Sequence, residues 1–278
     1  MASSGRPELP EGGDSGSFLR SFGRQVKIFR ERAGLTQVEL GREVGYGEDQ
    51  IGAVEQGKRI PKPEFVDRVD HVLNAGGVLM AMKGEIARVR YPAFFRGAAR
   101  AEAEAAELHV YASHVVPGLL QTEDYSRAIL AMRRPVLDEE TIEQRVSARL
   151  ARQEIFSRHP APLMSFVIEE VMLYRRFGGA RVMRGQLEQL LLFGQKRHVE
   201  IQVMPTHRED NAGVDGPFTL LIPESGEQIA YMEGQGRSIL VTERQEVRAI
   251  ASRYGIIRAQ ALTPRESLIF IEKLLGEL

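Results

Sequence analysis

The chain has 278 residues, enough for two domains with separate cores, and its 43% hydrophobic and 27% charged residues are typical of an ordinary globular protein. The absence of cysteine excludes disulfides and cysteine-based metal sites or nucleophiles, and it suits a reducing compartment. A formal net charge of −1 argues against strong general affinity for nucleic acid. No apolar run approaches the roughly 20 residues of a membrane span, and residues 1–17 lack the apolar core of a signal peptide. We therefore expect a cytoplasmic protein with no membrane contact.

The N-terminal part of the chain predicts a tail followed by a helix. Residues 1–16 are rich in glycine, serine, proline and glutamate, which favours disorder. Apolar residues then recur at helical spacing, so we expect a first helix over residues 17–32 that closes a small core.

Residues 36–59 have the spacing of a helix-turn-helix. Thr36 is suited to cap the first helix, and a glutamate three residues later, Glu39, completes a capping box. The glycines of Gly45-Tyr46-Gly47 break that helix, because they permit backbone angles that a helix forbids. The second helix should run from about residue 48 to residue 56 and stop at Gly57.

The outward face of this second helix is where a recognition helix meets base edges in a major groove. The residues expected to read bases are Glu48, Asp49, Gln50, Ala53 and Gln56. Carboxylates can accept a hydrogen bond from cytosine N4 and glutamine can pair with adenine, but the carboxylates also repel phosphates. The residues expected to contact phosphates are therefore Arg24, Lys27, Gln37, Lys58, Arg59 and Lys62.

The charge of this region limits its affinity. Residues 17–74 contain ten lysines and arginines against nine aspartates and glutamates, a balance near +1. We expect modest affinity for double-stranded DNA with a shallow salt dependence, aided by homodimerisation or by a partner.

The helix-turn-helix resembles that of the XRE (Cro/cI-type) repressor family. The matching residues are Gln37, Leu40, Gly45, Ile51, Val54, Glu55, Gly57 and Arg59-Ile60-Pro61. Many members carry serine where this chain has Gly47, followed by a basic or neutral residue, whereas here Glu48 and Asp49 follow. The resemblance implies a DNA-binding head over residues 17–75 with four to five helices. The competing interpretation is a helical hairpin with no nucleic-acid role.

The rest of the chain predicts a helical connector over residues 76–107 and a C-terminal domain over residues 108–278. Helices are expected at 78–90, 93–107, 138–158, 181–197, 242–254 and 264–275, with another from about residue 122. Strands are expected at 108–114, 165–173, 199–204, 217–222 and 228–233. The order strand, helix, strand predicts a parallel crossover, and the last two strands predict a hairpin. Capping boxes are expected at Thr242 with Gln245 and at Thr263 with Glu266. The fold class is thus an all-α head joined to an α/β domain with a sheet of about four strands.

One loop of the C-terminal domain is a candidate ligand or partner site. It follows a strand expected to be parallel, at the end where α/β sheets bind ligands. Its polar residues are His207, Arg208, Glu209, Asp210 and Asn211. The competing interpretation is a solvated polar loop. The six histidines form no dense ligand pattern and the chain contains no phosphate-binding or catalytic motif, so we expect no metal, no cofactor, no catalytic residue and no enzyme.

Four further segments resemble landmarks of a large actinomycete family that fuses an XRE head to a C-terminal domain of long-unassigned function. They are residues 116–125, 145–153, 216–218 and 254–267. The resemblance implies a transcriptional regulator of the group that contains WhiJ-like developmental regulators. It also implies a small BldB-like partner protein, in an arrangement similar to an antitoxin-toxin pair.

Three hypotheses follow. The first is a sequence-specific DNA-binding regulator, acting as a dimer, whose C-terminal domain senses a partner protein or a ligand. The second is an antitoxin-like protein-interaction module in which DNA binding is secondary. The third, which the absent motifs disfavour, is an enzymatic C-terminal domain.

Overall fold

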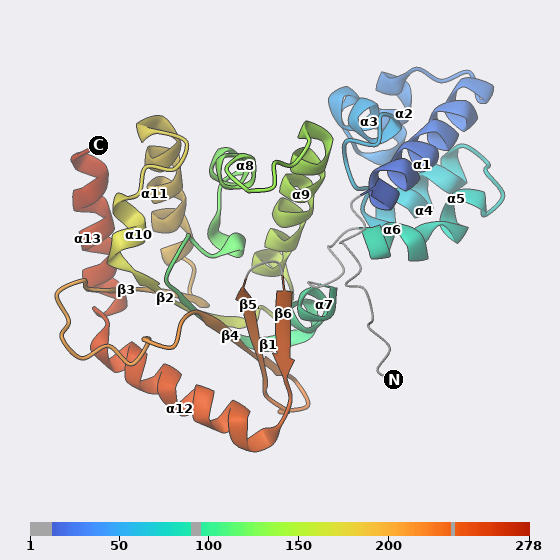
Figure 1. Ribbon diagram of the computed structural model, residues 1–278. Coiled ribbons are helices and arrows are strands. Elements are labelled where there is room, and N and C mark those ends of the chain that lie inside the picture. Colours follow the sequence, from blue (N-terminus) through green and yellow to red (C-terminus); the bar gives the residue numbers. More distant parts are fainter. Residues whose placement is uncertain (1–12, 90–95, 235–236) are drawn as a thin grey trace, which may run out of the picture. The chain divides into compact units, whose positions relative to one another are not determined.

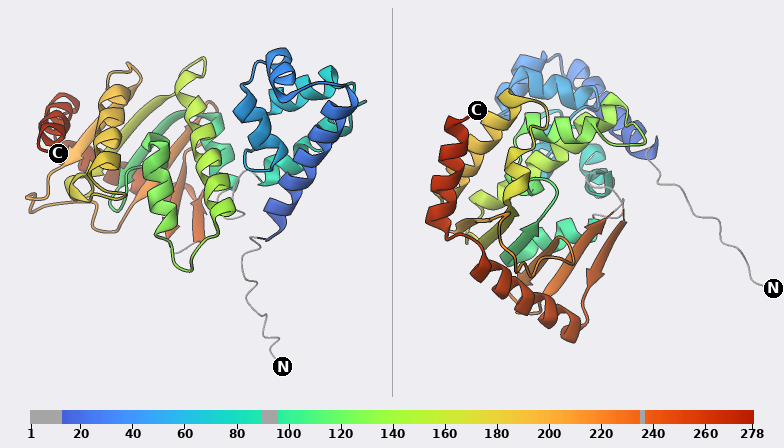
Figure 2. Two further views of the ribbon diagram at one scale, coloured as in Figure 1. Left: turned by 90° about the horizontal axis from the view of Figure 1, so that it is seen from above. Right: turned by 60° about the vertical axis from the view of Figure 1, so that its left-hand side comes forward.

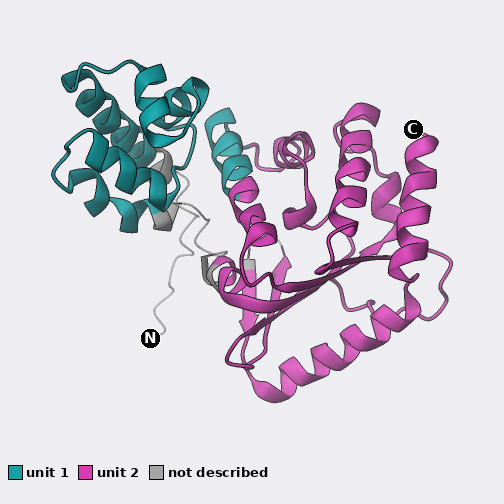
Figure 3. Cartoon of the chain, turned by 180° about the vertical axis from the view of Figure 1, so that it is seen from behind, with its two compact units in different colours: residues 1–91, 137–148 teal, residues 92–136, 149–278 magenta. Residues whose placement is uncertain are grey.

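The computed structural model describes residues 13–89, 96–234 and 237–278. The chain divides into two compact units, residues 1–91 with 137–148 and residues 92–136 with 149–278 (Figure 3). Most of the predicted disordered tail lies outside the described residues, and the first helix begins at Gly13. Among the described residues, no helix is both long and apolar enough to cross a membrane.

The first unit contains a helical head. Its helices are α1 (Gly13–Arg32), α2 (Gln37–Val44), α3 (Glu48–Glu55), α4 (Pro63–Val72), α5 (Val78–Ala81) and α6 (Lys83–Val89). Their apolar faces meet in one core that includes Phe22, Leu40, Ile51 and Phe65, all of them fully buried. The predicted helix-turn-helix is therefore confirmed as an arrangement of α2 and α3 packed on α1 and α4.

One prediction for the connector is corrected. The single helix expected over residues 78–90 is two short helices, α5 and α6, separated at Met82. The buried carboxylate of Asp70 accepts hydrogen bonds from the backbone N–H groups of Gly77, Leu79 and Met80, which satisfies the first donors of α5. This tertiary contact sets the direction of α5, and no local pattern reveals it.

The second unit is built on a mixed sheet of six strands (Figure 1). They are β1 (Ala105–Ala112), β2 (Leu163–Glu169), β3 (Val199–Met204), β4 (Phe218–Pro223), β5 (Ile229–Gly234) and β6 (Arg237–Val241). The order across the sheet is β3-β2-β1-β4-β5-β6. The pairs β1–β2 and β2–β3 are parallel, while β1–β4, β4–β5 and β5–β6 are antiparallel.

The fold class is confirmed, and so are the parallel crossover from β2 to β3 and the hairpin of β4 and β5. The expectation of about four strands is corrected to six. β1 enters the middle of the same sheet, between β2 and β4, and β6 extends the hairpin. β6 is short, and its residues Ile239 and Leu240 are exposed, so the alternation that marks a half-buried strand is missing there.

Helices cover both faces of this sheet (Figures 1 and 2). The helices and 3₁₀ turns are α7 (Arg96–Glu104), η2 (Gly118–Leu120), α8 (Glu123–Ala131), α9 (Glu139–Arg152), η3 (Gln153–Ser157), α10 (Glu170–Tyr174), α11 (Ala180–Gly194), α12 (Arg244–Gln260) and α13 (Pro264–Gly276). α12 runs across one face, and α8 and α11 lie over the other. α9 is divided between the units, with its residues up to Ala148 in the first.

The strands of the second unit separate two cores. One includes Leu108, Phe166 and Leu187, and the other includes Tyr111 and Tyr254, under α12. Because side chains alternate along a strand, β1 contributes to both cores, as expected of a central strand covered on each face.

Several predicted boundaries are corrected. The helix expected over 93–107 gives way to β1 at Ala105, so the strand expected over 108–114 begins earlier and ends at Ala112; what was expected of residues 93–95 lies outside the described residues. The strand expected over 165–173 becomes α10 at Glu170. The helix expected over 138–158 tightens into η3 after Arg152.

The two capping boxes of the last helices differ in outcome. The box of Thr263 and Glu266 is confirmed, since the Thr263 N–H donates to Glu266 Oε2 at 2.9 Å and Thr263 Oγ1 accepts from the Glu266 N–H at 3.3 Å. The box expected at Thr242 is wrong. Glu243 caps α12 instead, because its carboxylate accepts from the N–H groups of Gln245 at 3.0 Å and Glu246 at 2.8 Å.

Candidate nucleic-acid interface

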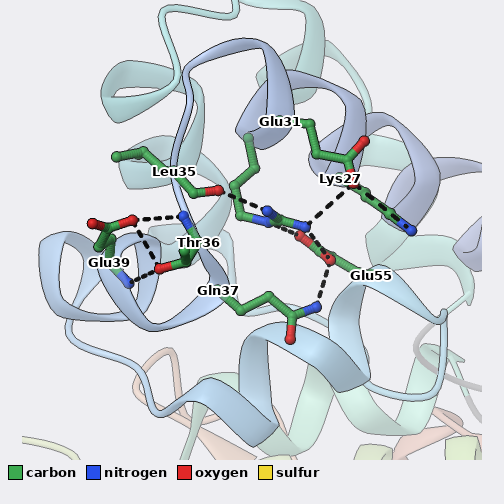
Figure 4. A network of polar contacts seen from close by, with 8 residues as sticks. Lys27, Glu31, Leu35, Thr36, Gln37, Glu39 and Glu55 are labelled. Atoms are coloured by element: carbon green, nitrogen blue, oxygen red, sulfur yellow. Dashed lines mark hydrogen bonds and ion pairs between the residues drawn. The ribbon is translucent and has the colours of Figure 1, made fainter.

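The start of α2 is defined by the predicted capping box (Figure 4). Thr36 Oγ1 accepts from the Glu39 N–H at 3.2 Å, and the Thr36 N–H donates to Glu39 Oε2 at 2.7 Å. The pKa of Glu39 is lowered because its carboxylate accepts hydrogen bonds from the backbone N–H and from the hydroxyl of Thr36. The first helix of the motif therefore begins where the sequence predicts.

The turn between α2 and α3 is tight because glycine occupies the positions where a side chain does not fit. Gly45 ends α2 with φ of 76°, in the left-handed region that favours glycine. A Cβ on Gly41 would lie 2.4 Å from the carbonyl oxygen of Tyr46, so the chain can fold back closely only over glycine. The Tyr46 ring packs on Phe65 of α4, with ring centroids 4.6 Å apart, which anchors the turn to the core.

A buried ion pair joins α1 to α3. Arg30 donates from Nε to Glu55 Oε1 at 2.6 Å and from Nη2 to Oε2 at 3.1 Å (Figure 4). Both residues are only 8% exposed, and the hydrogen bond with Glu55 raises the pKa of Arg30. Two parallel hydrogen bonds fix the plane of the guanidinium relative to the plane of the carboxylate, so this pair orients α3 relative to α1.

Two more contacts extend the pair to α2. Gln37 Nε2 donates to Glu55 Oε2 at 2.7 Å, and Arg30 Nη1 donates to the carbonyl oxygen of Leu35 at 2.7 Å. Sequence reasoning missed the ionic role of Arg30 and Glu55. Glu55 was identified only as a family match, although a carboxylate on the inward face of an amphipathic helix is itself a signal that a buried cation is needed.

The side chains predicted to read bases lie on the solvent side of α3. Glu48, Asp49 and Gln56 are exposed, and Gln50 and Ala53 are partly exposed. Gln50 Oε1 also accepts from the Gly47 N–H at 3.3 Å, which holds this amide beside the first turn of the helix. The opposite side of α3 is buried through Ile51 and Val54. The exposed face can thus meet a groove while the buried face holds the helix in place.

The side chains predicted to contact phosphates come from α1, α2 and the segment after α3. Arg24, Lys27 and Lys58 are exposed, and Arg59 and Lys62 are partly exposed. Lys27 lies 3.8 Å from Glu31, one helical turn away. Gln37 is partly buried and its amide N–H is given to Glu55. α1 approaches α3 closely at Gly23, where a Cβ would lie only 2.3 Å from the carbonyl oxygen of Val54.

The candidate loop of the C-terminal unit is mostly solvated. His207, Arg208, Glu209 and Asp210 are exposed, whereas Asn211 turns toward the sheet. The Asn211 amide donates to Glu169 Oε1 at 2.8 Å.

The carboxylate that receives Asn211 also holds a tyrosine. The Tyr111 hydroxyl donates to Glu169 Oε1 at 2.6 Å, and burial followed by this hydrogen bond raises the pKa of Tyr111. A Cβ on Gly213 would collide with the Tyr111 hydroxyl, at 2.1 Å. Asn211 therefore binds Glu169 at the carboxyl end of β2, beside Tyr111 of β1. The four exposed residues of the loop stay available to solvent.

The segment at residues 116–122 is held by a dense set of hydrogen bonds around Gln121, which is 1% exposed. Its amide Nε2 donates to the Val116 carbonyl oxygen at 2.6 Å, and its Oε1 accepts from the Ser126 hydroxyl at 3.0 Å and from the Arg149 guanidinium. Its own carbonyl oxygen accepts from Gln153 Nε2 at 2.6 Å.

These bonds join two of the sequence landmarks, residues 116–125 and 145–153. Gln186 of α11 completes the arrangement, because its amide donates to the Leu120 carbonyl oxygen at 2.8 Å and accepts from the Thr122 N–H at 2.9 Å. The side-chain nitrogen and oxygen of Gln121 and its carbonyl oxygen all have partners, as a buried amide requires. The landmarks therefore build the interior of the unit. Among the described residues, no three His, Asp or Glu side chains are grouped so that they could hold a metal ion.

Comparison with known families gives two matches. Residues 21–82 match a family described as a helix-turn-helix domain, and residues 95–273 match the family described as "Domain of unknown function (DUF5753)". No curated protein and no solved structure matches the chain. The helix-turn-helix domain supports a DNA-binding regulator. The second match spans more than half of the chain, so the chain belongs to the DUF5753 family.

Proposed function

We propose that the chain is a sequence-specific, XRE-type transcriptional regulator that inserts α3 into the major groove of double-stranded DNA. The observation that carries this proposal is the buried hydrogen-bond network of the helix-turn-helix. In it, Arg30, Gln37 and Glu55 join α1, α2 and α3. A rigid scaffold with one exposed helix face is what direct reading of base edges needs.

The exposed face divides into two roles. Gln50 and Gln56 offer amides that pair with adenine, and the carboxylates of Glu48 and Asp49 accept from cytosine N4. Arg24, Lys27, Lys58, Arg59 and Lys62 hold the backbone phosphates and carry no sequence information. Gln37 joins this second set through its first-turn position on α2, while its amide supports Glu55.

Two substitutions separate the roles. Gln50→Ala should cost about 1–3 kcal/mol of discrimination at one base pair, because one pairing amide is lost. Arg59→Ala should weaken binding to all sequences alike. Fluorescence anisotropy on a fragment upstream of the protein's own gene, and on single-base variants of it, measures both. Equal losses on every site from Gln50→Ala would contradict the assignment of base reading.

The C-terminal domain is proposed to receive a signal from a partner protein or a ligand, and not to act as an enzyme. Its exposed loop at His207, Arg208, Glu209 and Asp210 supplies both charges at the carboxyl end of the parallel strands. A small BldB-like protein is the partner that we propose. Pull-down of this protein by the wild-type chain, set against a chain with Arg208→Ala and Asp210→Ala, tests the role of the loop. Equal capture by both chains would remove the loop from the interface.

A second candidate function is an antitoxin-like interaction module with DNA binding secondary. The observation that favours it is the acidic opening of α3, where the exposed Glu48 and Asp49 repel phosphates. If the upstream fragment is not shifted at moderate salt, with or without the small partner, this candidate replaces the first. A shift by the chain alone favours the regulator.

A further inference from the structure

Within the part of the chain that the structure describes, β6 is the last strand of the sheet, so one of its edges has no strand beside it. It pairs with β5, from Ala230 opposite Val241 to Gly234 opposite position 237, and the strand order ends there. Ile239 is 60% exposed and Leu240 is 45% exposed. An edge strand presents a row of backbone N–H and C=O groups, so an apolar one is a template for pairing with another chain.

The opposite edge of the same sheet is protected. Five of the six residues of β3 are buried, and α13 and α12 pack against this strand. Figures 1 and 2 show these helices beside β3. Natural proteins protect edges by covering them or by placing proline, lysine or a bulge in them. β6 contains neither proline nor lysine and a single charged residue, at position 237. Its pairing with β5 is continuous, and its residues Ile239 and Leu240 are apolar and exposed.

We propose that the β6 edge pairs with β6 of a second copy of this chain, antiparallel and across a two-fold axis at Ile239, so that two sheets become one. This inference rests on the proposed DNA-binding function for its choice of partner. A helix-turn-helix reader recognises two half-sites through a two-fold dimer, and a two-fold interface requires a surface that complements itself.

β6 meets that requirement residue by residue. With the axis at position 239, Ile239 faces Ile239 of the second copy, Ser238 faces Leu240, and position 237 faces Val241. Each exposed apolar side chain thereby gains a neutral neighbour, and no carboxylate lies in the paired segment. Side-chain alternation puts Ile239 and Val241 on the α12 side, where Val241 already packs in the core under α12. The paired strands continue that core from one copy into the next.

The length of β6 sets the strength of the dimer. Five residues from each copy bury less area than the roughly 1,200–2,000 Å² of a stable protein interface. The dimer is therefore weak and concentration-dependent in free solution, and neighbouring half-sites on DNA strengthen it by holding two copies together. This agrees with the modest charge of the head, which leaves single-copy binding weak.

Cysteine cross-linking tests the register, because the chain contains no cysteine of its own. Opposed residues of an antiparallel pair have Cα atoms about 4.5–5.5 Å apart, which suits a disulfide. Ile239→Cys should therefore give a covalent dimer under mild oxidation. Leu240→Cys is the matched control, since position 240 faces position 238 and two copies of residue 240 lie beyond disulfide reach. A dimer from the control alone, or from neither variant, overturns the pairing.

A second measurement removes the edge without a cross-link. Ile239→Lys places like charges opposite each other and should weaken self-association by about tenfold or more. Ile269→Lys on α13 is the control, because Ile269 is similarly exposed at 57% and lies away from β6. Sedimentation velocity over a dilution series, with circular dichroism to verify folding, measures the difference. Equal self-association in both variants overturns the proposal, and so does a wild-type chain that stays monomeric throughout.

DNA binding is measured separately on the same proteins. A chain that dimerises through β6 and shifts no DNA contradicts the proposed function and leaves this inference standing. A chain that binds DNA specifically and forms neither the cross-link nor the dimer supports the proposed function and contradicts the pairing of β6. If Ile239→Lys leaves the chain monomeric like the wild type but abolishes capture of the small partner protein, the edge receives the partner's strand, and the second-copy proposal is wrong.

Discussion

At the scale of single residues, the most consequential contact is the ion pair of Arg30 and Glu55. Removing one member leaves the other as an unpaired buried charge, which costs far more than losing an exposed pair. The bonds from Gln37 and to Leu35 satisfy further atoms of the two side chains, so a single change affects three segments of the motif.

Glu55→Ala should therefore lower the free energy of unfolding by about 3–5 kcal/mol. Glu48→Ala is the matched control on the same helix, and it should change stability by about 0.5 kcal/mol or less because Glu48 is exposed. Urea unfolding followed by circular dichroism gives both values. Similar midpoints for the two variants would show that the pair does not hold the motif.

A second prediction concerns His109 on β1. Its ring stacks on Tyr254 at 5.2 Å, its Nε2 lies 3.3 Å from Glu107 Oε2, and its Nδ1 is buried with no partner among the described residues. Burial lowers the pKa of His109, against the opposing effect of Glu107. The charged groups facing it are Glu107, Glu200 and Arg258.

Because the neutral ring is favoured in the folded state, the unfolded chain binds this proton more readily. The contribution of His109 to stability is then complete above its ordinary pKa of about 6.5 and is lost as the pH falls below that value. His109→Gln cannot titrate, so its urea midpoint should fall less than that of the wild type between neutral and mildly acidic pH. Parallel curves for the two proteins would assign the acid sensitivity to other groups.

At the scale of elements, the helix-turn-helix depends on glycines that differ in what surrounds them. Gly41 lies against the Tyr46 carbonyl oxygen, whereas a Cβ on Gly47 would meet no atom within 4 Å. Only the first is required by packing. Gly47 has φ of −74°, which any residue can adopt.

Gly41→Ala should destabilise the head by about 1–3 kcal/mol, because the added methyl group forces the turn away from α2. Gly47→Ala should cost only about 0.5 kcal/mol, because alanine is a poorer helix N-cap than glycine but its Cβ would meet no neighbouring atom. Thermal unfolding and DNA anisotropy on both variants compare the effects. If Gly41→Ala changed neither the unfolding temperature nor the DNA affinity, the turn could open without loss of stability or binding.

Elements whose signals are local were predictable. The capping boxes of Thr36 and Thr263 and the glycine stop of α2 each depend on residues within one turn, and all three are present. The N-cap of α12 was misplaced by one residue, because threonine is a preferred N-cap residue and glutamate is not, yet Glu243 occupies the cap position in the fold.

At the scale of the whole molecule, the balance of charge governs DNA binding. The head has a balance near +1 within a chain of net charge −1, so few phosphates can be neutralised. The fit of α3 to the groove and the placement of individual basic residues must therefore supply the affinity that general electrostatic attraction does not.

The logarithm of the DNA association constant should fall shallowly with the logarithm of salt concentration, by about 0.9 for each phosphate contacted. Lys58→Ala should flatten this slope by about one unit, because Lys58 is exposed next to α3. Glu246→Ala, in the first turn of α12, is the control outside the head. Anisotropy titrations across a salt series measure the slopes. A slope unchanged by Lys58→Ala would exclude a phosphate contact at this residue.

By itself, the sequence determined the helix-turn-helix, the caps of its helices, the parallel crossover and the hairpin, because each depends on neighbours in the chain and on a repeating apolar period. Only the tertiary structure decided that β1 lies between β2 and β4, that Arg30 meets Glu55, and that Asn211 turns inward to Glu169. These contacts join residues far apart in the chain, and they form because a buried charge or amide must find a partner wherever packing brings one. The position of β6 at the end of the described sheet belongs with them, because only the strand order of the fold decides which strand lies last.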